Sequence, residues 1–139
     1  MMQKCIFIDS DVLIDVFAKR QPFYVLSAKC LELAEDGKYQ AYTSPLIIAN
    51  VFYVIHKFSE KITAMDCIKK IRQYINIVNV DQKCVDQALT SEFTDFEDAI
   101  QNYSAENAVM DAILTRNTAH YKKSSLSIML PEEVVALVN

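Results

Sequence analysis

Glycine is almost absent from this sequence. The only glycine among the 139 residues is Gly37. Phosphate-binding loops of the P-loop and Rossmann kinds need several closely spaced glycines, because their backbone N–H groups must approach the phosphates. The composition therefore excludes both kinds of nucleotide site.

Cysteine is sparse, and long apolar runs are missing. The four cysteines are Cys5, Cys30, Cys67 and Cys84. They form neither a C-x-x-C pair nor a Cys/His zinc pattern, which favours reduced, mostly buried thiols over disulfides. Asp9 cuts short the only apolar run near the start, and no run approaches the roughly 18 residues that a membrane helix needs. We expect a cytoplasmic protein without a signal peptide or membrane segment.

Positive charge is not in excess, because the formal net charge is −4. An acidic balance argues against non-specific binding of nucleic acid through a broad basic face. It does not exclude an enzyme that acts on nucleic acid. A bound divalent cation would reverse the sign of the local potential where the chemistry occurs.

Short apolar segments alternate with longer amphipathic ones over residues 1–139, which have the size of one domain. Five segments indicate strands: Lys4–Ile8, Gln40–Thr43, Ile75–Val80, Ala112–Leu114 and Leu126–Leu130. The main segments between and after them indicate helices: 9–17, Phe23–Asp36, Pro45–Phe58, Thr63–Tyr74, 81–91, Phe93–Asn107 and one that begins at Pro131. Thr63 and Asp66 fit a capping box. We predict a three-layer α/β fold with a central parallel sheet of four to five short strands and helices on both faces.

Two acids directly follow the first predicted strand. In parallel sheets of this class the ligand site lies beyond the carboxyl ends of the strands. Asp9 leaves a buried strand, where a carboxylate costs free energy unless it is paired or binds a cation. A helix cap explains one acid here, but Asp11 adds another within a turn. We predict a functional role for Asp9, leave Asp11 open, and expect Asp15 to be a solvated helix residue.

A second acidic pair opens a later helix. Asp95 and Asp98 are three residues apart and share one helix face. Acids in a first turn complement the helix dipole without any further role. Like charges on one face repel each other, however, and a metal ion would relieve that repulsion. We therefore treat Asp98 and Asp95 as candidate metal ligands.

Two further polar positions follow predicted strands. Asn50 lies in the apolar segment SPLIIANVFYVI, where a lone amide needs partners. It is either a structural hydrogen bonder or a side chain that reaches the site. Thr115 ends a strand before Arg116 and Asn117, and its hydroxyl is placed to face the same cleft as Asp9. A simple turn is the alternative.

Four motifs occur in an order that resembles the PIN-domain family, the fold of many VapC-type toxin ribonucleases. They are FIDSDVLIDVF, SPLIIANVFYVI, DFEDAIQNYSA, and ILTRN followed by LSIMLPEEVV. The resemblance covers nearly the whole chain. It implies an endoribonuclease that depends on Mg²⁺ or Mn²⁺, with RNA as substrate. It also implies the toxin of a toxin–antitoxin pair, with an antitoxin protein as partner.

The resemblance also assigns roles to particular residues. It carries the family's first acid onto Asp9 and the third onto Asp98, with Asp95 as a possible neighbour. The family's hydroxyl position falls on Thr115. Metal ligation is thus expected of Asp9, Asp98 and Asp95.

The sequence departs from the family pattern at two positions. A Glu usually occupies the position of Asn50, and an Asp usually occupies that of His120. The alternative is therefore a catalytically impaired PIN-like module that binds RNA or a protein partner. A receiver-like phosphoacceptor domain also clusters acids at strand ends, but it expects a Lys after the last strand, where this chain has Leu130 and Pro131.

Two groups of surface residues suggest contacts with other molecules. The candidates for contact with RNA are Arg116, Asn117, Lys122 and Lys123, although a solvated turn explains them equally well. Aromatic residues expected to be exposed occur in the early helices: Phe23, Tyr24, Phe52 and Tyr53. Together with the apolar excess and the resemblance to dimeric toxins, they predict a homodimer.

Overall fold

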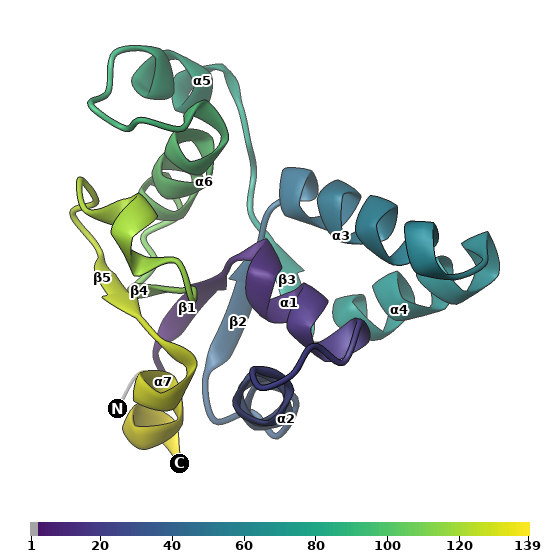
Figure 1. The fold of residues 1–139 in the computed structure, drawn as a ribbon. Coiled ribbons are helices and arrows are strands. Elements are labelled where there is room, and N and C mark those ends of the chain that lie inside the picture. The colour runs from purple at the N-terminus through teal and green to yellow at the C-terminus, as the bar shows by residue number, and fades with distance from the viewer. Residues whose placement is uncertain (1–2) are drawn as a thin grey trace.

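The central sheet has five parallel strands. The structure, a computed structural model, describes residues 3–139. The strands are β1 Cys5–Ile8, β2 Gln40–Thr43, β3 Ile75–Ile77, β4 Ala112–Leu114 and β5 Ser127–Met129. They lie in the order β3-β2-β1-β4-β5 (Figure 1). The predicted parallel sheet is confirmed, although β3 and β5 are shorter than expected.

Helices cover both sides of this sheet. The helices are α1 Ser10–Phe17, α2 Tyr24–Glu35, α3 Pro45–Phe58, α4 Lys61–Tyr74, α5 Gln82–Leu89, α6 Phe96–Asn107, the 3-10 helix η1 Thr118–Tyr121, and α7 Pro131–Val138. Figure 1 shows α5 and α6 on one side of the sheet, and α1, α2 and α7 on the other. The α3–α4 hairpin extends to one side and packs on α1 through α3. The predicted three-layer arrangement is confirmed.

Side-chain caps decide where several helices begin. Ser44 accepts a hydrogen bond from the Ile47 backbone N–H (3.1 Å), so α3 begins at Pro45 as predicted. Asp95 caps α6 in the same way, which makes that helix start later than the predicted Phe93. The predicted capping box at Thr63 is wrong. Helix α4 begins at Lys61 without a side-chain cap, so Thr63 lies inside it.

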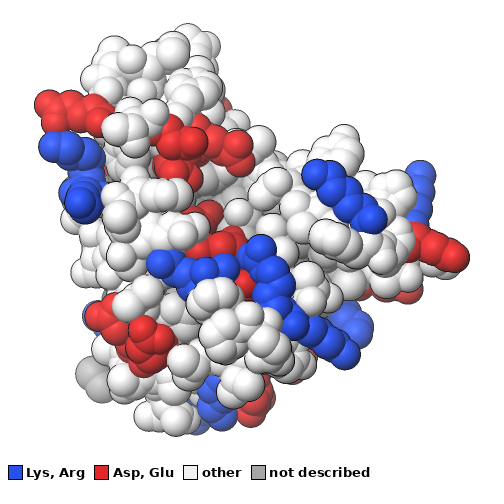
Figure 2. Space-filling model, in the orientation of Figure 1, with Lys and Arg blue, Asp and Glu red and all other residues white. Residues whose placement is uncertain are grey.

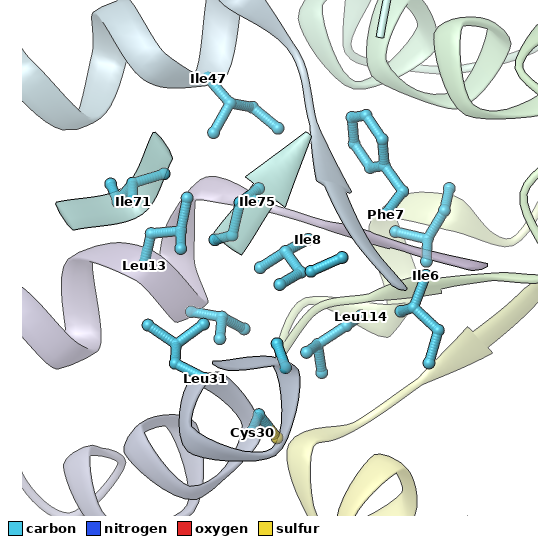
Figure 3. Packing of buried hydrophobic residues seen from close by; sticks show 14 of the residues in the cluster. Ile6, Phe7, Ile8, Leu13, Cys30, Leu31, Ile47, Ile71, Ile75 and Leu114 are labelled. Atoms are coloured by element: carbon cyan, nitrogen blue, oxygen red, sulfur yellow. The ribbon is translucent and has the colours of Figure 1, made fainter. Parts of the chain in front are cut away.

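The core is centred on β1. Ile6, Phe7 and Ile8 are all fully buried, as expected for a central strand covered on both faces. In Figure 3, Ile8 lies toward Leu13 and Leu31 from α1 and α2, whereas Phe7 points toward the side of α6. Asp9, the residue that follows β1, therefore lies directly at the edge of the buried apolar core.

The order of the strands predicts a ligand site at the end of β1. The chain passes from β1 to β2 on one side, and later returns to place β4 on the other. At such a reversal the loops that follow the two central strands diverge and leave room for a ligand. The Asp9 backbone N–H donates to the Leu114 carbonyl (3.0 Å), so the ends of β1 and β4 lie side by side there.

Two further predictions came from composition: the state of the cysteines and the absence of a membrane-spanning segment. All four cysteines are free, but only Cys30 and Cys84 are buried, whereas Cys5 and Cys67 are half-buried, so the expectation of mostly buried thiols holds for two of the four. No helix within residues 3–139 combines the length and the apolar character that crossing a membrane requires.

Candidate functional site

Asp9 has two roles at the end of β1. Its Oδ1 accepts a hydrogen bond from the Ser10 backbone N–H (2.8 Å), which caps α1. Its Oδ2 accepts from the hydroxyls of Thr115 (3.0 Å) and Tyr121 (3.2 Å). The residue is only 8% exposed. Capping and a site role therefore coexist in this carboxylate, because each oxygen faces a different way.

Asp11 is buried beside it and is incompletely paired. Its Oδ2 accepts from the Arg116 backbone N–H (2.9 Å) and lies 3.3 Å from the Thr115 hydroxyl oxygen. The Thr115 hydroxyl carries one proton, so it can satisfy Asp9 or Asp11 but not both at once. Asp11 Oδ1 is buried and has no hydrogen-bond partner. An unpaired buried carboxylate oxygen is costly, and a cation or a proton would satisfy it.

Asp98 comes from the other side of the sheet, in the first turn of α6. Its side chain is 20% exposed, and Oδ2 lies 3.3 Å from Nδ1 of His120 on η1. Asp95, one residue before the helix, accepts from the Asp98 backbone N–H (2.9 Å) and is exposed. Asp95 therefore acts as a helix cap here, and its role as a metal ligand stays a prediction.

The three acids oppose one another's ionisation. Burial and, after it, the negative charge of Asp11 raise the pKa of Asp9 to about 7, with a smaller contribution from Asp98. Burial, followed by the charge of Asp95, raises the pKa of Asp98 to about 6. Burial also raises the pKa of Asp11. Asp9, Asp11 and Asp98 thus form an acidic cluster, and within residues 3–139 no Lys or Arg side chain forms an ion pair with it.

The acidic cluster suits a divalent ion, although it does not enclose one. Oxygen ligands, the unpaired Asp11 Oδ1 and the raised pKa values all fit a hard cation such as Mg²⁺ or Mn²⁺. Within residues 3–139, no three His, Cys, Asp or Glu side chains are gathered closely enough to hold an ion by themselves. Water would have to complete the coordination, as it commonly does for Mg²⁺.

Asp15 is not the solvated helix residue that we predicted. It is 0% exposed and lies on the buried side of α1. Arg116 contacts both of its oxygens (Nε 2.6 Å and Nη2 3.0 Å), and Arg20 Nε lies 3.0 Å away. The Ser27 hydroxyl donates to it as well (3.2 Å). We call Asp15, Arg116, Arg20 and Ser27 the ion-pair cluster. It compensates a buried carboxylate with two guanidinium groups.

Arg116 is therefore held by protein groups. Besides its contacts with Asp15, its guanidinium carbon lies 3.7 Å from the centre of the Phe23 ring. Its backbone N–H binds Asp11. These contacts anchor the Thr115–Asn117 turn against α1, and the predicted contact of Arg116 with RNA gains no support from them.

The other candidate residues stay predictions. Asn50 is half-buried in α3, and no hydrogen bond in the part of the chain described joins it to the acidic cluster. The side chains of Asn117 and Lys122 are exposed. Lys123 lies 3.4 Å from Glu92, and both of these side chains are largely exposed, so this ion pair is weak.

Tyr121 is a site residue that the sequence reasoning missed. It is 1% exposed, and burial beside Asp9 raises the pKa of its hydroxyl far above the usual range. The hydroxyl therefore stays protonated and donates to Asp9. The signal in the sequence was weak: a single aromatic residue after the TRN turn, on a 3-10 helix that we did not predict.

Charge is unevenly distributed over this face. Figure 2 shows acidic side chains inside a hollow near the middle of the face, and basic side chains along the edge below it. Acidic groups thus sit inside the hollow while cationic groups border it. A negatively charged ligand would approach the hollow favourably only if a cation offset its acids.

Comparison with known proteins gives consistent matches. The family model of the PIN domain matches residues 5–119 of this chain. A curated protein from Aquifex aeolicus (strain VF5), named Ribonuclease VapC1, is 25% identical over 138 residues, which cover 96% of this chain and 94% of that protein.

Solved structures share the fold at lower identity. The chain superimposes on a toxin-antitoxin complex from Klebsiella pneumoniae with a TM-score of 0.68 at 21% identity, covering 91% of this chain and 97% of that one. For VapC20 from Mycobacterium tuberculosis, named a Sarcin-Ricin loop cleaving toxin, the TM-score is 0.61 at 13% identity, covering 78% and 86%. At these identities the structures establish the fold alone.

Proposed function

Because the chain belongs to the PIN-domain family, we propose that it is a metal-dependent endoribonuclease and the toxin of a toxin–antitoxin pair. The observation that supports metal-dependent activity is the acidic cluster, where a buried oxygen of Asp11 has no hydrogen-bond partner and burial raises the pKa of the neighbouring Asp9. The relative named Ribonuclease VapC1 supports RNA as the substrate. An RNA substrate also fits a cytoplasmic protein.

The residues of the acidic cluster and their neighbours have two roles in this proposal, metal binding and positioning. Asp9 and Asp98 would hold the ion, with Asp95 and the free oxygen of Asp11 close by. When bound, the ion supplies a water of lowered pKa and stabilises negative charge on the phosphoryl group. The hydroxyls of Thr115 and Tyr121 orient Asp9, and the Arg116 backbone N–H fixes Asp11.

We propose that Mn²⁺ supports this activity better than Mg²⁺. The His120 Nδ1 atom lies 3.3 Å from Asp98 Oδ2, at the position where relatives usually carry an acid. Imidazole nitrogen is a poorer ligand for Mg²⁺ than carboxylate oxygen is, whereas Mn²⁺ tolerates it better. His120→Asp is expected to raise the activity measured in Mg²⁺. Equal activity of both proteins in Mg²⁺ would contradict this role.

The alternative is a PIN-like module that binds RNA or protein without cleaving it. Two observations favour it: no complete set of three ligands is gathered within residues 3–139, and Asn50 and His120 replace usual acids. A binding module predicts that RNA binds and stays intact whichever metal is added.

An RNA cleavage assay separates the two functions. Wild type and Asp98→Asn would be incubated with total RNA in Mn²⁺, in Mg²⁺ and in EDTA. The nuclease proposal predicts cleavage by wild type in Mn²⁺, none in EDTA, and a loss of at least about a hundredfold in Asp98→Asn, as for other groups that stabilise transition-state charge. Intact RNA in every reaction would favour the binding module.

Two protein partners follow from the same proposal. The structural neighbour from Klebsiella pneumoniae is a toxin-antitoxin complex, so we propose a small antitoxin as partner. We also propose that the protein forms a homodimer. Its interface would lie over the cavity of about 440 Å³ between α3 and α4, whose lining includes Phe52, Tyr53 and Met65. Light scattering would test the dimer, and Tyr53→Ser, at a residue that is 65% exposed, should weaken it. A monomeric wild type at high concentration would contradict it.

A further inference from the structure

A separate cavity of about 320 Å³ lies beside the acidic cluster. Its apolar lining includes Phe23, Leu26 and Leu130, and its charged groups are Arg116 and Glu132. Phe23 and Leu26 are 40% and 41% exposed, so the cavity is open to solvent. A cavity of this size, mostly apolar with a few polar groups, is typical of a site for a small ligand or a fragment of a larger one.

Arg116 connects this cavity to the acidic cluster. Its backbone N–H donates to Asp11 (2.9 Å), and its guanidinium lines the cavity. The distance between the two sites is therefore no more than the length of one arginine side chain. A nucleotide chain with a phosphodiester at the acidic cluster could place an adjacent group in the cavity.

The balance of charge favours a neutral group over a phosphate. Arg116 and Arg20 bring two positive charges, and buried Asp15 offsets one of them. Glu132 adds a negative charge at the cavity, so the whole set is close to neutral. Arg116 directs Nε and Nη2 at Asp15, and its guanidinium carbon lies 3.7 Å from the centre of the Phe23 ring, so these groups are already engaged by protein partners.

These features fit a flat heterocycle. We propose that the cavity binds a nucleobase of single-stranded RNA, packed against Leu26 and the part of the Phe23 ring that Arg116 leaves exposed, with Glu132 accepting a hydrogen bond from an exocyclic amino group. Proteins recognise single-stranded RNA in this way, through stacking and contacts with base edges. The inference rests on the proposed ribonuclease function only for the source of the base.

Glu132 also predicts which bases bind. Cytosine, adenine and guanine each offer an exocyclic amino group to a carboxylate. Uracil offers a single ring N–H between two carbonyl oxygens, and those oxygens repel a carboxylate. We expect all three amino-bearing bases to bind more tightly than uracil.

Neutral nucleosides test the cavity without involving a phosphate or a metal. Cytidine and uridine would be titrated into the metal-free protein in EDTA, with binding followed by NMR chemical shifts. We expect cytidine to bind at least about fivefold more tightly than uridine, in line with roughly 1–3 kcal/mol for a well-made base contact. Phe23→Ala should weaken cytidine binding about tenfold, because stacking contributes about 1–3 kcal/mol per base. Phe58→Ala, at an aromatic residue on α3 that is 79% exposed, should not.

Glu132→Gln is the second variant, because Phe23 also supports Arg116 and its loss can affect folding. Glu132 is exposed, and its replacement should remove the preference for cytidine over uridine while the protein stays folded. Binding that ignores both substitutions, or no saturable binding of either nucleoside, overturns the proposal. A protein that binds cytidine as predicted but cleaves no RNA supports the cavity, and contradicts only the ribonuclease function.

Discussion

Two aspartates on α1, one helical turn apart, have opposite environments. Asp11 is 8% exposed and Asp15 is 0% exposed, so burial hardly distinguishes them. Asp15 contacts two guanidinium groups and a hydroxyl, whereas Asp11 keeps one oxygen without a partner. The difference between the two carboxylates therefore lies in their hydrogen-bond and ion-pair partners, and not in their burial.

The largest effect is expected at the compensated carboxylate. Asp15→Asn leaves Arg116 and Arg20 without their counter-charge, and the cost is at most the roughly 3–5 kcal/mol of breaking a fully buried ion pair, because both arginine side chains are partly exposed. Urea unfolding should show this loss in the free energy of unfolding. The matched control is Asp66→Asn on the exposed side of α4, which should change it by less than about 0.5 kcal/mol. Similar values for the two variants would remove the contrast between the clusters.

Neutralising Asp9 in the acidic cluster should raise the free energy of unfolding, whereas Asp15→Asn should lower it. Because burial raises the pKa of Asp9 from 3.8 to about 7, the folded state holds this proton more tightly than the unfolded chain. The free energy of unfolding then falls as the pH rises between these two values and stays low above them. At pH 8 without metal, Asp9→Asn should be more stable than wild type by roughly 4 kcal/mol, since each pKa unit corresponds to about 1.36 kcal/mol.

Thermal unfolding of Asp9→Asn and wild type at pH 3 and pH 8 tests whether the substitution stabilises the protein. At pH 3 this contribution vanishes, because Asp9 is protonated in both the folded and unfolded states. A variant that is less stable than wild type at pH 8 would mean that the Asp9 carboxylate is already compensated.

Adding metal should stabilise the wild type by a smaller amount. An ion that binds only the folded state at one hundred times its Kd adds about 2.7 kcal/mol to the free energy of unfolding. The melting temperature in Mn²⁺ at pH 8 should therefore rise, and EDTA should reverse the rise. The shift should shrink near pH 5, where protons compete for Asp9. An equal shift at both pH values would place the ion elsewhere.

The smallest effect is expected at Tyr121. Tyr121→Phe removes one hydrogen bond to Asp9, and a bond to a charged group contributes about 1.5 kcal/mol or somewhat more. Tyr103→Phe is the matched control, since Tyr103 is half-buried on α6 away from Asp9. Denaturant unfolding at pH 8 should separate the two variants, and identical values would show that the hydroxyl does not support Asp9.

The sequence was sufficient for the elements whose signals are local. Helix α3 begins and ends as predicted because Ser44 and Pro45 define its start. Strands β2 and β4 match as well, since their apolar runs are short and bounded by polar residues. The start of α4 did not follow the local rule, because no side-chain cap defines it and the helix runs two residues further back than Thr63.

The site was predictable only where chain order places residues together. Asp9 directly follows β1, and Thr115 directly follows β4, so their proximity followed from a parallel sheet. The fate of Asp15 depended on Arg116, which is 101 residues away in sequence. No periodicity reveals such a pairing, and Asp15 was therefore misassigned as solvated.

Calorimetric titration of Mn²⁺ into the metal-free protein at pH 8 tests most directly whether the acidic cluster, unlike the ion-pair cluster, binds a cation. Wild type should bind Mn²⁺ at one saturable site, because no Lys or Arg side chain within residues 3–139 forms an ion pair with the acidic cluster. Asp98→Asn should lose this binding by at least about tenfold while Asp66→Asn retains it, since an exposed acid on α4 plays no part. If wild type binds no Mn²⁺, or if Asp98→Asn binds it as tightly, the acidic cluster is not a metal site.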